Sequence, residues 1–303
     1  MTDISRTILN EYQVRKSKKQ KTAFIELLRS RFPDLQVQEG GSFGNRNIII
    51  GNIQNAKVIF TAHYDTCAVL PVPNFITPKS PLLSILYSVL LIVPMFLVAY
   101  LFNLLLGFFT GDFWLHYWLT LAVYVALLLF IMFGPANQHT ANDNTSGVIT
   151  LCELLCSLSD AEREKAAFVF FDNEETGLIG SSHFRKTFKK EIKHKLLVNF
   201  DCVSDGSNLL LAVTKNARNA YENTITESFQ DTENKVFLIE KAEKIYYPSD
   251  QMGFKSTIAV AALKHKPIIG YYMDRIHTPK DTVFDEENID LLVHCVHRFL
   301  EKI

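Results

Sequence analysis

Apolar residues occur in short blocks along most of the chain, separated by polar stretches. Runs that suit the inside of a sheet predict strands at 57–62, 166–171, 196–200, 209–213, 257–262 and 268–272, with shorter strands at 36–38 and 47–50. Helical spacing predicts helices at 4–31, 145–158, 181–188, 216–229 and 285–302. Strands that alternate with helices predict an α/β fold: a three-layer, mixed and mostly parallel sheet flanked by helices.

Two long apolar segments, 81–109 and 113–133, interrupt this rhythm. Asp112 is the single formal charge between Lys79 and Asp143. Each segment exceeds the roughly 20 residues that a helix needs to cross about 30 Å of hydrocarbon. We therefore expect residues 81–134 to form an inserted two-helix hydrophobic hairpin that spans the lipid bilayer twice. A buried or substrate-covering helical pair in a soluble protein is the alternative.

A hairpin returns the chain to the side of the membrane that it left, so 1–80 and 135–303 are expected to form one domain. Lys79 and a basic run at 15–21 belong to that domain, whereas the hairpin tip has no Lys or Arg. The positive-inside rule then predicts a cytoplasmic domain. Five cysteines without a CxxC pair, and an N-terminus without an apolar signal-peptide segment, agree with this expectation. The basic run is interpreted as a solvated helix face or as a contact with anionic lipid headgroups.

Acidic and histidine side chains follow several predicted strands or flank a helix start, and they have the chemistry of metal ligands. These candidates are His63, Asp65, Asp143, Glu174, Glu175, Asp201 and His277. Open α/β sheets place their sites at the carboxyl ends of strands, which predicts that the group converges. Asp143 lies between two amides, and its two oxygens can hold two cations. Nitrogen and oxygen ligands without thiolates suit zinc, or manganese and cobalt in the same geometry.

The candidates belong to an ordered series of motifs. The series runs His63-x-Asp65, Asn142-Asp143-Asn144-x-x-Gly147, Glu174-Glu175-x-Gly177, Asp201, Ser249-Asp250-x-x-x-Phe254 and Ile276-His277-Thr278-Pro279-x-Asp281-Thr282. Taken together, it resembles the di-zinc aminopeptidases of metallopeptidase family 28, to which glutaminyl cyclases are also similar. The resemblance covers about residues 1–80 and 135–303, leaves the hairpin outside, and implies a zinc exopeptidase type of fold and a catalytic zinc peptidase domain.

The resemblance also implies a role for each matched residue and two zinc ions per chain. Asp143 bridges the two ions, His63 and Asp201 complete one site, and Glu175 and His277 complete the other. Glu174 is the catalytic base, Asp65 orients His63 through its second ring nitrogen, and Asp281 supports the His277 loop. Cys67 and Cys202 are interpreted as packing residues, and His294 and His297 as structural or surface residues.

The sequence thus predicts a membrane-anchored zinc exopeptidase, an aminopeptidase that hydrolyses N-terminal peptide bonds. A glutaminyl cyclase-type acyltransferase needing one zinc, and a dipeptidase or carboxypeptidase on the same fold, are alternatives. A membrane receptor or scaffold would predict eroded ligands, and all five are intact. The 31 basic and 32 acidic residues nearly cancel, which does not favour a nucleic acid partner. Because the hairpin lies between His63 and Asp143, we expect the site to face the bilayer and accept hydrophobic or membrane-released peptides.

Overall fold

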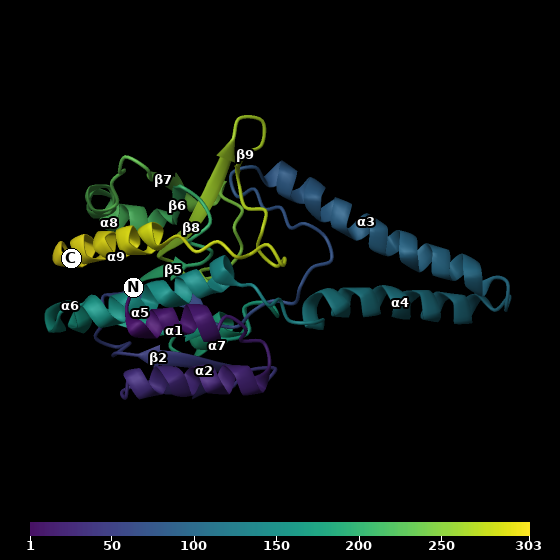
Figure 1. The fold of residues 1–303 in the computed structure, drawn as a ribbon, viewed down its shortest axis with the longest axis horizontal. Helices are drawn as coiled ribbons and strands as arrows, with labels where there is room; N and C mark the ends of the chain where they lie inside the picture. Colours follow the sequence, from purple (N-terminus) through teal and green to yellow (C-terminus); the bar gives the residue numbers. More distant parts are fainter.

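A nine-stranded sheet forms the centre of the protein in the computed structural model, which describes residues 1–303 (Figure 1). The strands are β1 (Gln36–Glu39), β2 (Arg46–Ile50), β3 (Val58–His63), β4 (Ala166–Phe171), β5 (Leu196–Phe200), β6 (Asn208–Val213), β7 (Val236–Lys241), β8 (Thr257–Lys266) and β9 (Gly270–Tyr272). Their order is β1-β2-β4-β3-β5-β8-β6-β7, with β9 paired to β8. The central strands β4, β3, β5 and β8 are parallel, and antiparallel pairs lie on either side of them.

Helices cover both faces of the sheet. They are α1 (Asp3–Glu11), α2 (Lys18–Arg31), α5 (Gly147–Ser157), α6 (Asp160–Lys165), α7 (Ile179–Thr187), α8 (Lys215–Ser228) and α9 (Glu286–Glu301), with a 3-10 turn, η2, at Ala242–Lys244. Alternate strand residues divide between two sides, as the pleat requires. Phe60 and Phe168 join the large core under α1, α2, α5, α8 and α9, whereas Ile59 and Val169 pack toward α7. The predicted three-layer α/β fold class is confirmed.

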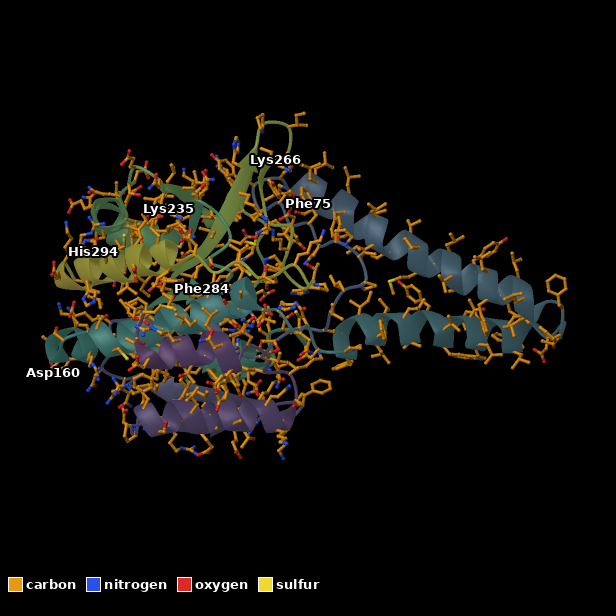
Figure 2. The ribbon with its side chains drawn as sticks, viewed as in Figure 1. Phe75, Asp160, Lys235, Lys266, Phe284 and His294 are labelled. Atoms are coloured by element: carbon orange, nitrogen blue, oxygen red, sulfur yellow. The ribbon has the colours of Figure 1, made fainter.

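The predicted hairpin consists of helices α3 (Pro81–Leu106) and α4 (Phe113–Phe133), which project together from the body (Figure 1). Both are long and apolar enough to cross a membrane. Helix α4 buries no residue at all, and α3 buries only Ser84, Met95 and Ala99. Figure 2 shows side chains along both helices that consist almost entirely of carbon. The hairpin is therefore not a core element that the body covers.

The N-terminal segment differs from its prediction as one helix over 4–31. It breaks into α1 and α2 because Ser17 caps α2. The Ser17 hydroxyl accepts from the Gln20 backbone N–H, and the Gln20 side-chain oxygen accepts from the Ser17 backbone N–H. Arg15, between the helices, is fully buried and donates to the Tyr64 carbonyl and to Thr145 Oγ1. Lys21 is also buried, against Asp172. The interpretation of the basic run as a solvated face is wrong for these two residues.

Two elements, one strand and one short helix, escaped prediction. Strand β7 is an edge strand with mostly exposed or half-buried side chains, so its apolar pattern is weak. Helix α6 is a single short segment with its own capping box at Ser159 and Glu162. The remaining predicted strands and helices are present with boundaries shifted by a few residues, and β9 returns antiparallel beside β8.

Candidate metal centre

Three parallel strands bring the predicted acids and histidine to one edge of the sheet. His63 is the last residue of β3, Asp201 directly follows β5, and Glu174 and Glu175 follow β4 by a short turn. Strand β3 pairs with both β4 and β5, so the carboxyl ends of all three are adjacent. This is the edge at which open α/β sheets carry their sites. The strand order, which the sequence alone did not give, is what places these residues side by side.

Asp143 reaches the same edge from the segment η1 (Ala141–Ser146), where the backbone of Asp143 and Asn144 is not helical. The two flanking amides fix this segment. Asn142 Oδ1 accepts from the backbone N–H groups of Ser204 and Asp205, and Asn144 donates to the Phe200 carbonyl at 3.0 Å. The amides therefore tie Asp143 to the end of β5.

The glycine that ends the Asn142–Gly147 motif is required by close packing. A Cβ atom at this position would lie 2.3 Å from the carbonyl oxygen of Phe200 and 2.5 Å from Asn144 Oδ1. No real side chain tolerates contacts that short, so helix α5 can approach β5 only with glycine at its start. The glycine thus lets the Asp143 segment lie directly against the strand end.

A first cluster of metal-binding groups consists of His63, Asp143 and Asp201, whose ligand atoms all lie within 4.8 Å of one another. His63 Nε2 is 3.3 Å from Asp143 Oδ1 and 3.5 Å from Asp201 Oδ1. All three residues are buried. The structure therefore brings together the three groups that were predicted to form one metal site.

A second cluster lies on the other oxygen of the same carboxylate. His277 Nε2 is 2.9 Å from Asp143 Oδ2 and 3.3 Å from Glu175 Oε2. Each carboxylate oxygen of Asp143 thus faces a different histidine. This arrangement has the form of a shared ligand between two cation positions.

Asp65 connects the first histidine to the turn that carries the glutamates. His63 Nδ1 lies 3.1 Å from the backbone carbonyl of Asp65 and 3.6 Å from its carboxylate. The two carboxylate oxygens accept the backbone N–H groups of Glu174 and Glu175 at 3.0 and 3.2 Å. Asp65 therefore holds both His63 and the glutamate turn in place. Glu174 itself lies near His63, with ligand atoms of His63, Glu174 and Glu175 within 4.8 Å.

Crowding of buried acids shifts the pKa values of the centre. Burial raises the pKa of Glu175 to about 8, and it raises the pKa of Glu174 well above its ordinary value, with the neighbouring carboxylates adding to the effect. Burial would lower the pKa of His277, but the charges of Glu175 and Asp143 raise it to about 9. A cluster of this kind binds positive charge strongly, because cations offset the repulsion among its carboxylates.

Two further acids belong to the centre. Asp281 was predicted to support the His277 loop. Its carboxylate instead accepts the backbone N–H groups of Asn142 and Asp143 at 2.8 and 3.0 Å, so it supports the Asp143 segment. Asp250 was noted only as part of a motif. It is fully buried, and neither carboxylate oxygen has a hydrogen-bond partner. Burial raises its pKa to about 7; the charges of Asp65 and Asp201 also raise it, whereas His63 acts to lower it.

Cys67, which was interpreted as a packing residue, lies next to the second cluster. Its sulfur is within 4.8 Å of the ligand atoms of Glu175 and His277. The histidines of α9 have no such place, since His297 contacts Glu162 and Ser157 and His294 is exposed (Figure 2). The sequence offered one hint for Cys67, its position four residues after His63.

The donor set fits zinc. It consists of three carboxylates and two imidazoles, oxygen and nitrogen ligands that zinc accepts. Glu175 Oε1 is buried and has no hydrogen-bond partner, as expected of an oxygen that is placed to meet a cation. His63 is held through its Nδ1 side, which leaves Nε2 directed at Asp143 and Asp201.

Both ends of the hairpin are anchored beside this centre. Before α3, the Leu70 N–H donates to the His277 carbonyl at 2.8 Å, and the Val69 N–H donates to the Pro135 carbonyl beyond α4 at 2.8 Å. A bridge between Ala68 and Ala136 ties the two ends together. The hairpin therefore leaves and re-enters the body at the edge that carries the metal-binding groups.

An α/β sheet with paired acid and imidazole clusters at its carboxyl edge defines the zinc exopeptidase class of fold. A sequence profile of peptidase family M28 matches residues 124–301, more than half of the chain. The protein belongs to peptidase family M28. The predicted family and the predicted enzyme class, a zinc metallopeptidase, are thereby confirmed. A search of curated protein sequences found no match.

Solved structures show the same fold at low sequence identity. Glutaminyl cyclase from Porphyromonas gingivalis has a TM-score of 0.58 at 16% identity, over 99% of this chain and 97% of that one. The LapA aminopeptidase of Legionella pneumophila has a TM-score of 0.55 at 15% identity, over 99% and 67%. A Zn-dependent exopeptidase from Parabacteroides distasonis has a TM-score of 0.54 at 13% identity, over 98% and 96%. Because both aminopeptidases and cyclases have this fold, the fold alone does not select the reaction.

Proposed function

We propose that the protein is a membrane-anchored aminopeptidase that uses two zinc ions to hydrolyse the N-terminal peptide bond of its substrates. One observation carries this proposal: Asp143 directs one carboxylate oxygen toward His63 and the other toward His277. Asp201 completes the first group and Glu175 the second. Two intact groups that share a carboxylate favour a two-metal hydrolase over a one-zinc cyclase.

In this proposal, His63, Asp143 and Asp201 hold one zinc ion, and Asp143, Glu175 and His277 hold the other. A pair of zinc ions supplies Lewis acidity, which activates water and stabilises the negative charge that develops on the carbonyl oxygen of the scissile bond. Asp65 and Asp281 act as positioning residues. Asp65 fixes His63 and the glutamate turn, and Asp281 fixes the backbone on which Asp143 lies.

Glu174 is the proposed general base. It accepts a proton from the attacking water and donates a proton to the leaving amine. Its carboxylate lies near His63 and Glu175 and is not among the five proposed ligands, so it is free to exchange protons with water at the site. The Asp65 carboxylate receives the Glu174 N–H, so the base and the His63 ligand are held by one residue.

We assign residues 1–80 and 135–303 to the catalytic zinc peptidase domain and residues 81–134 to a transmembrane hairpin. The exposed apolar surface of α3 and α4 supports this division. Lys79 at the base, and a tip without Lys or Arg, favour a cytoplasmic catalytic domain. Because the hairpin is anchored beside His277, the site opens close to the bilayer, which favours hydrophobic peptides released from the membrane as substrates.

The test is hydrolysis of a substrate panel by the full-length protein in detergent, with and without a chelator. An aminopeptidase cleaves amino-acid amides and dipeptides, ignores N-blocked peptides, and loses this activity with the chelator. Cleavage of N-blocked peptides from the carboxyl end would indicate a carboxypeptidase. Cyclisation of N-terminal glutamine without hydrolysis would indicate a cyclase, and either outcome would contradict the proposal.

A further inference from the structure

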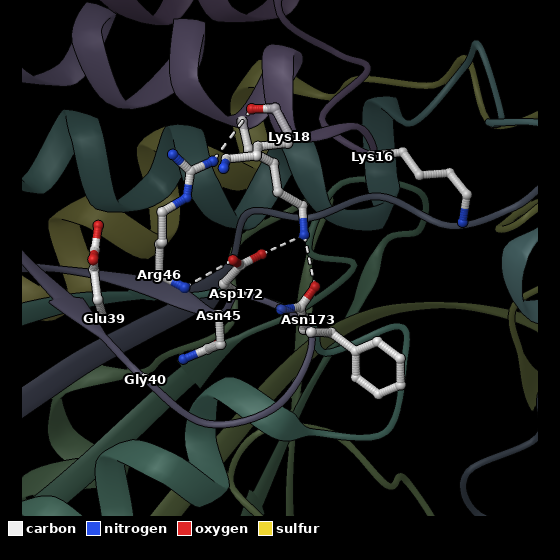
Figure 3. A pocket seen from close by; sticks show the side chains of 11 residues that line it. Lys16, Lys18, Glu39, Gly40, Asn45, Arg46, Asp172 and Asn173 are labelled. Atoms are coloured by element: carbon white, nitrogen blue, oxygen red, sulfur yellow. Dashed lines mark hydrogen bonds and ion pairs between the residues drawn. The ribbon is translucent and has the colours of Figure 1, made fainter.

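A polar cavity lies beneath the start of α2, beside the turn that leads from β4 to Glu174 (Figure 3). None of the proposed zinc ligands lines it. It has a volume of about 380 Å³, within the range of small-ligand sites. The α2 region, the turn between β1 and β2, and the residues after β4 all line it. The charged and amide side chains among them are Lys16, Lys18, Lys21, Glu39, Asn45, Arg46, Asp172 and Asn173.

Apart from the Lys21–Asp172 pair, the side chains that line this cavity carry mostly positive charge. Lys21 and Asp172 neutralise each other in a buried contact. Lys16, Lys18 and Arg46 form no ion pair, and Glu39 is the one remaining acid, also without an ion pair. The Arg46 guanidinium donates only to neutral oxygens, those of Thr22 and the Lys18 carbonyl. An anion that enters would therefore meet three cationic groups and one carboxylate.

Two buried amides in the wall point to a specific ligand rather than to general surface charge. Asn45 is 1% exposed, and neither its Nδ2 nor its Oδ1 has a hydrogen-bond partner. Asn173 is also buried; Lys21 occupies its Oδ1, and its Nδ2 has no partner. Unpaired buried amide donors are costly, so native proteins seldom carry them without a bound acceptor. Two such donors beside three cations suit an oxyanion with several acceptor oxygens.

The base of the hairpin adjoins the cavity. Lys16 Nζ donates to the carbonyl of Met132 at the end of α4, at 3.0 Å. Phe43, which lines the cavity and is 69% exposed, lies against Phe133 with ring centroids 5.9 Å apart. If α4 spans the bilayer, as proposed above, its end and the cavity lie at the depth of the lipid headgroups.

We infer that this cavity binds a phosphate group carrying net negative charge, as in the headgroup of an anionic phospholipid. Lys16, Lys18 and Arg46 supply the charge, and the amides of Asn45 and Asn173 supply neutral donors. The basic run that the sequence analysis left with two interpretations then has divided roles. Arg15 and Lys21 hold the fold together, and Lys16 and Lys18 line the cavity, Lys16 at the side next to the hairpin. The recognition of phosphate needs neither zinc nor peptide.

Calorimetric titration of the full-length protein in dodecyl maltoside micelles tests this inference with three probes. Dioctanoyl phosphatidylglycerol presents the phosphate on a lipid, glycerol 1-phosphate presents it free in solution, and dioctanoylglycerol lacks it. We expect saturable binding of the phospholipid and none of dioctanoylglycerol. Binding of glycerol 1-phosphate as well would show that the phosphate suffices, and its failure to bind would assign the site to lipid; both support the inference. Absence of saturable phospholipid binding would overturn it.

Charge-matched variants separate the cavity from the surface of the same helix. Lys16→Gln with Lys18→Gln should weaken phospholipid binding at least about tenfold, since each cation near an anionic headgroup contributes appreciably. Lys19→Gln with Arg31→Gln removes the same charge from exposed positions outside the cavity and should change binding less than about twofold. Equal losses in the two double variants would show diffuse surface attraction and overturn the inference.

A third variant tests the amide. Asn45→Asp keeps the size of the side chain but replaces a donor with a negative charge, and it should abolish saturable binding. Unchanged affinity in this variant would contradict a role for Asn45. Because the assay reads binding, a protein without peptidase activity would leave this result interpretable.

Discussion

The catalytic body and the hairpin arrange polar and apolar groups in opposite ways. The body buries carboxylates and imidazoles at the sheet edge, with Asp143 at 3% and Asp201 at 5% exposed. The hairpin exposes large apolar side chains, Phe108 and Phe109 at 83% and 85%. Water stabilises neither arrangement, since buried charge and exposed apolar surface both cost free energy. The difference supports the proposal that each region has a partner other than water: cations for the one and hydrocarbon for the other.

The largest effect on activity is expected from replacing Glu174, the proposed general base. Glu174→Gln keeps the shape of the side chain but cannot accept the proton, so activity should fall about 10²–10⁴-fold. Zinc content should stay unchanged, because Glu174 is not among the five proposed ligands. Hydrolysis rates and metal analysis of the same preparation check this. Full activity would exclude Glu174 as the base, and Glu164→Gln, at an exposed position on α6, serves as the control.

The body should be sensitive to loss of a buried charge partner. Lys21→Met leaves Asp172 buried and unpaired, which typically costs about 3–5 kcal/mol. Lys302→Met removes a partner from the exposed pair with Glu227 and should cost no more than about 1 kcal/mol. Denaturant midpoints of the two variants in detergent give the comparison. Equal shifts would mean that the body does not hold its charges in a low-dielectric interior.

The hairpin should be sensitive to the opposite change, the addition of a charge. Leu97 is 53% exposed on α3, so a soluble protein would tolerate arginine there. In a bilayer, Leu97→Arg should disfavour insertion by about 2.5–3.5 kcal/mol. The fraction of protein that resists extraction by alkaline carbonate should fall, while Leu97→Ala stays at the wild-type level. Identical fractions for both variants would contradict the transmembrane assignment.

The smallest effect is expected from replacing Asp281, which contacts the backbone on which Asp143 lies. Asp281→Asn retains one acceptor for the N–H groups of Asn142 and Asp143 but places an amide donor against the other. Loss of such support typically lowers metal affinity or activity about 10–100-fold. Zinc competition with a chromophoric chelator measures this directly. Asp290→Asn, on the exposed face of α9, should leave the affinity unaltered.

The sequence predicted most of the residues that converge at the sheet edge, because each of them follows a strand or belongs to a compact motif. His63, Glu175 and Asp201 could be placed at strand ends from apolar runs alone, without knowing the strand order. The contact of Asp281 with the Asp143 backbone escaped prediction, because it joins segments that are distant in sequence. The local sequence pattern indicates which side chains lie at the ends of strands. It does not indicate which distant backbone segment a side chain such as Asp281 contacts.

The N-terminal region shows the opposite limit. A continuous amphipathic pattern suggested one helix, but the capping box at Ser17 and the burial of Arg15 divide it. The charge of Arg15 and Lys21 favoured a solvated face. Both residues are buried instead, because they have tertiary partners just after β3 and just after β4. Strand β7 was not predicted because it lies at the sheet edge and buries little apolar surface, so its sequence lacks a clear apolar run.

Metal stoichiometry of the purified full-length protein tests the account most directly. Two groups that share Asp143 should hold two zinc ions per chain, and Asp143→Asn should lose both. Inductively coupled plasma mass spectrometry on matched protein samples gives the count. One ion per chain, or two that survive in Asp143→Asn, would contradict a centre built on that carboxylate.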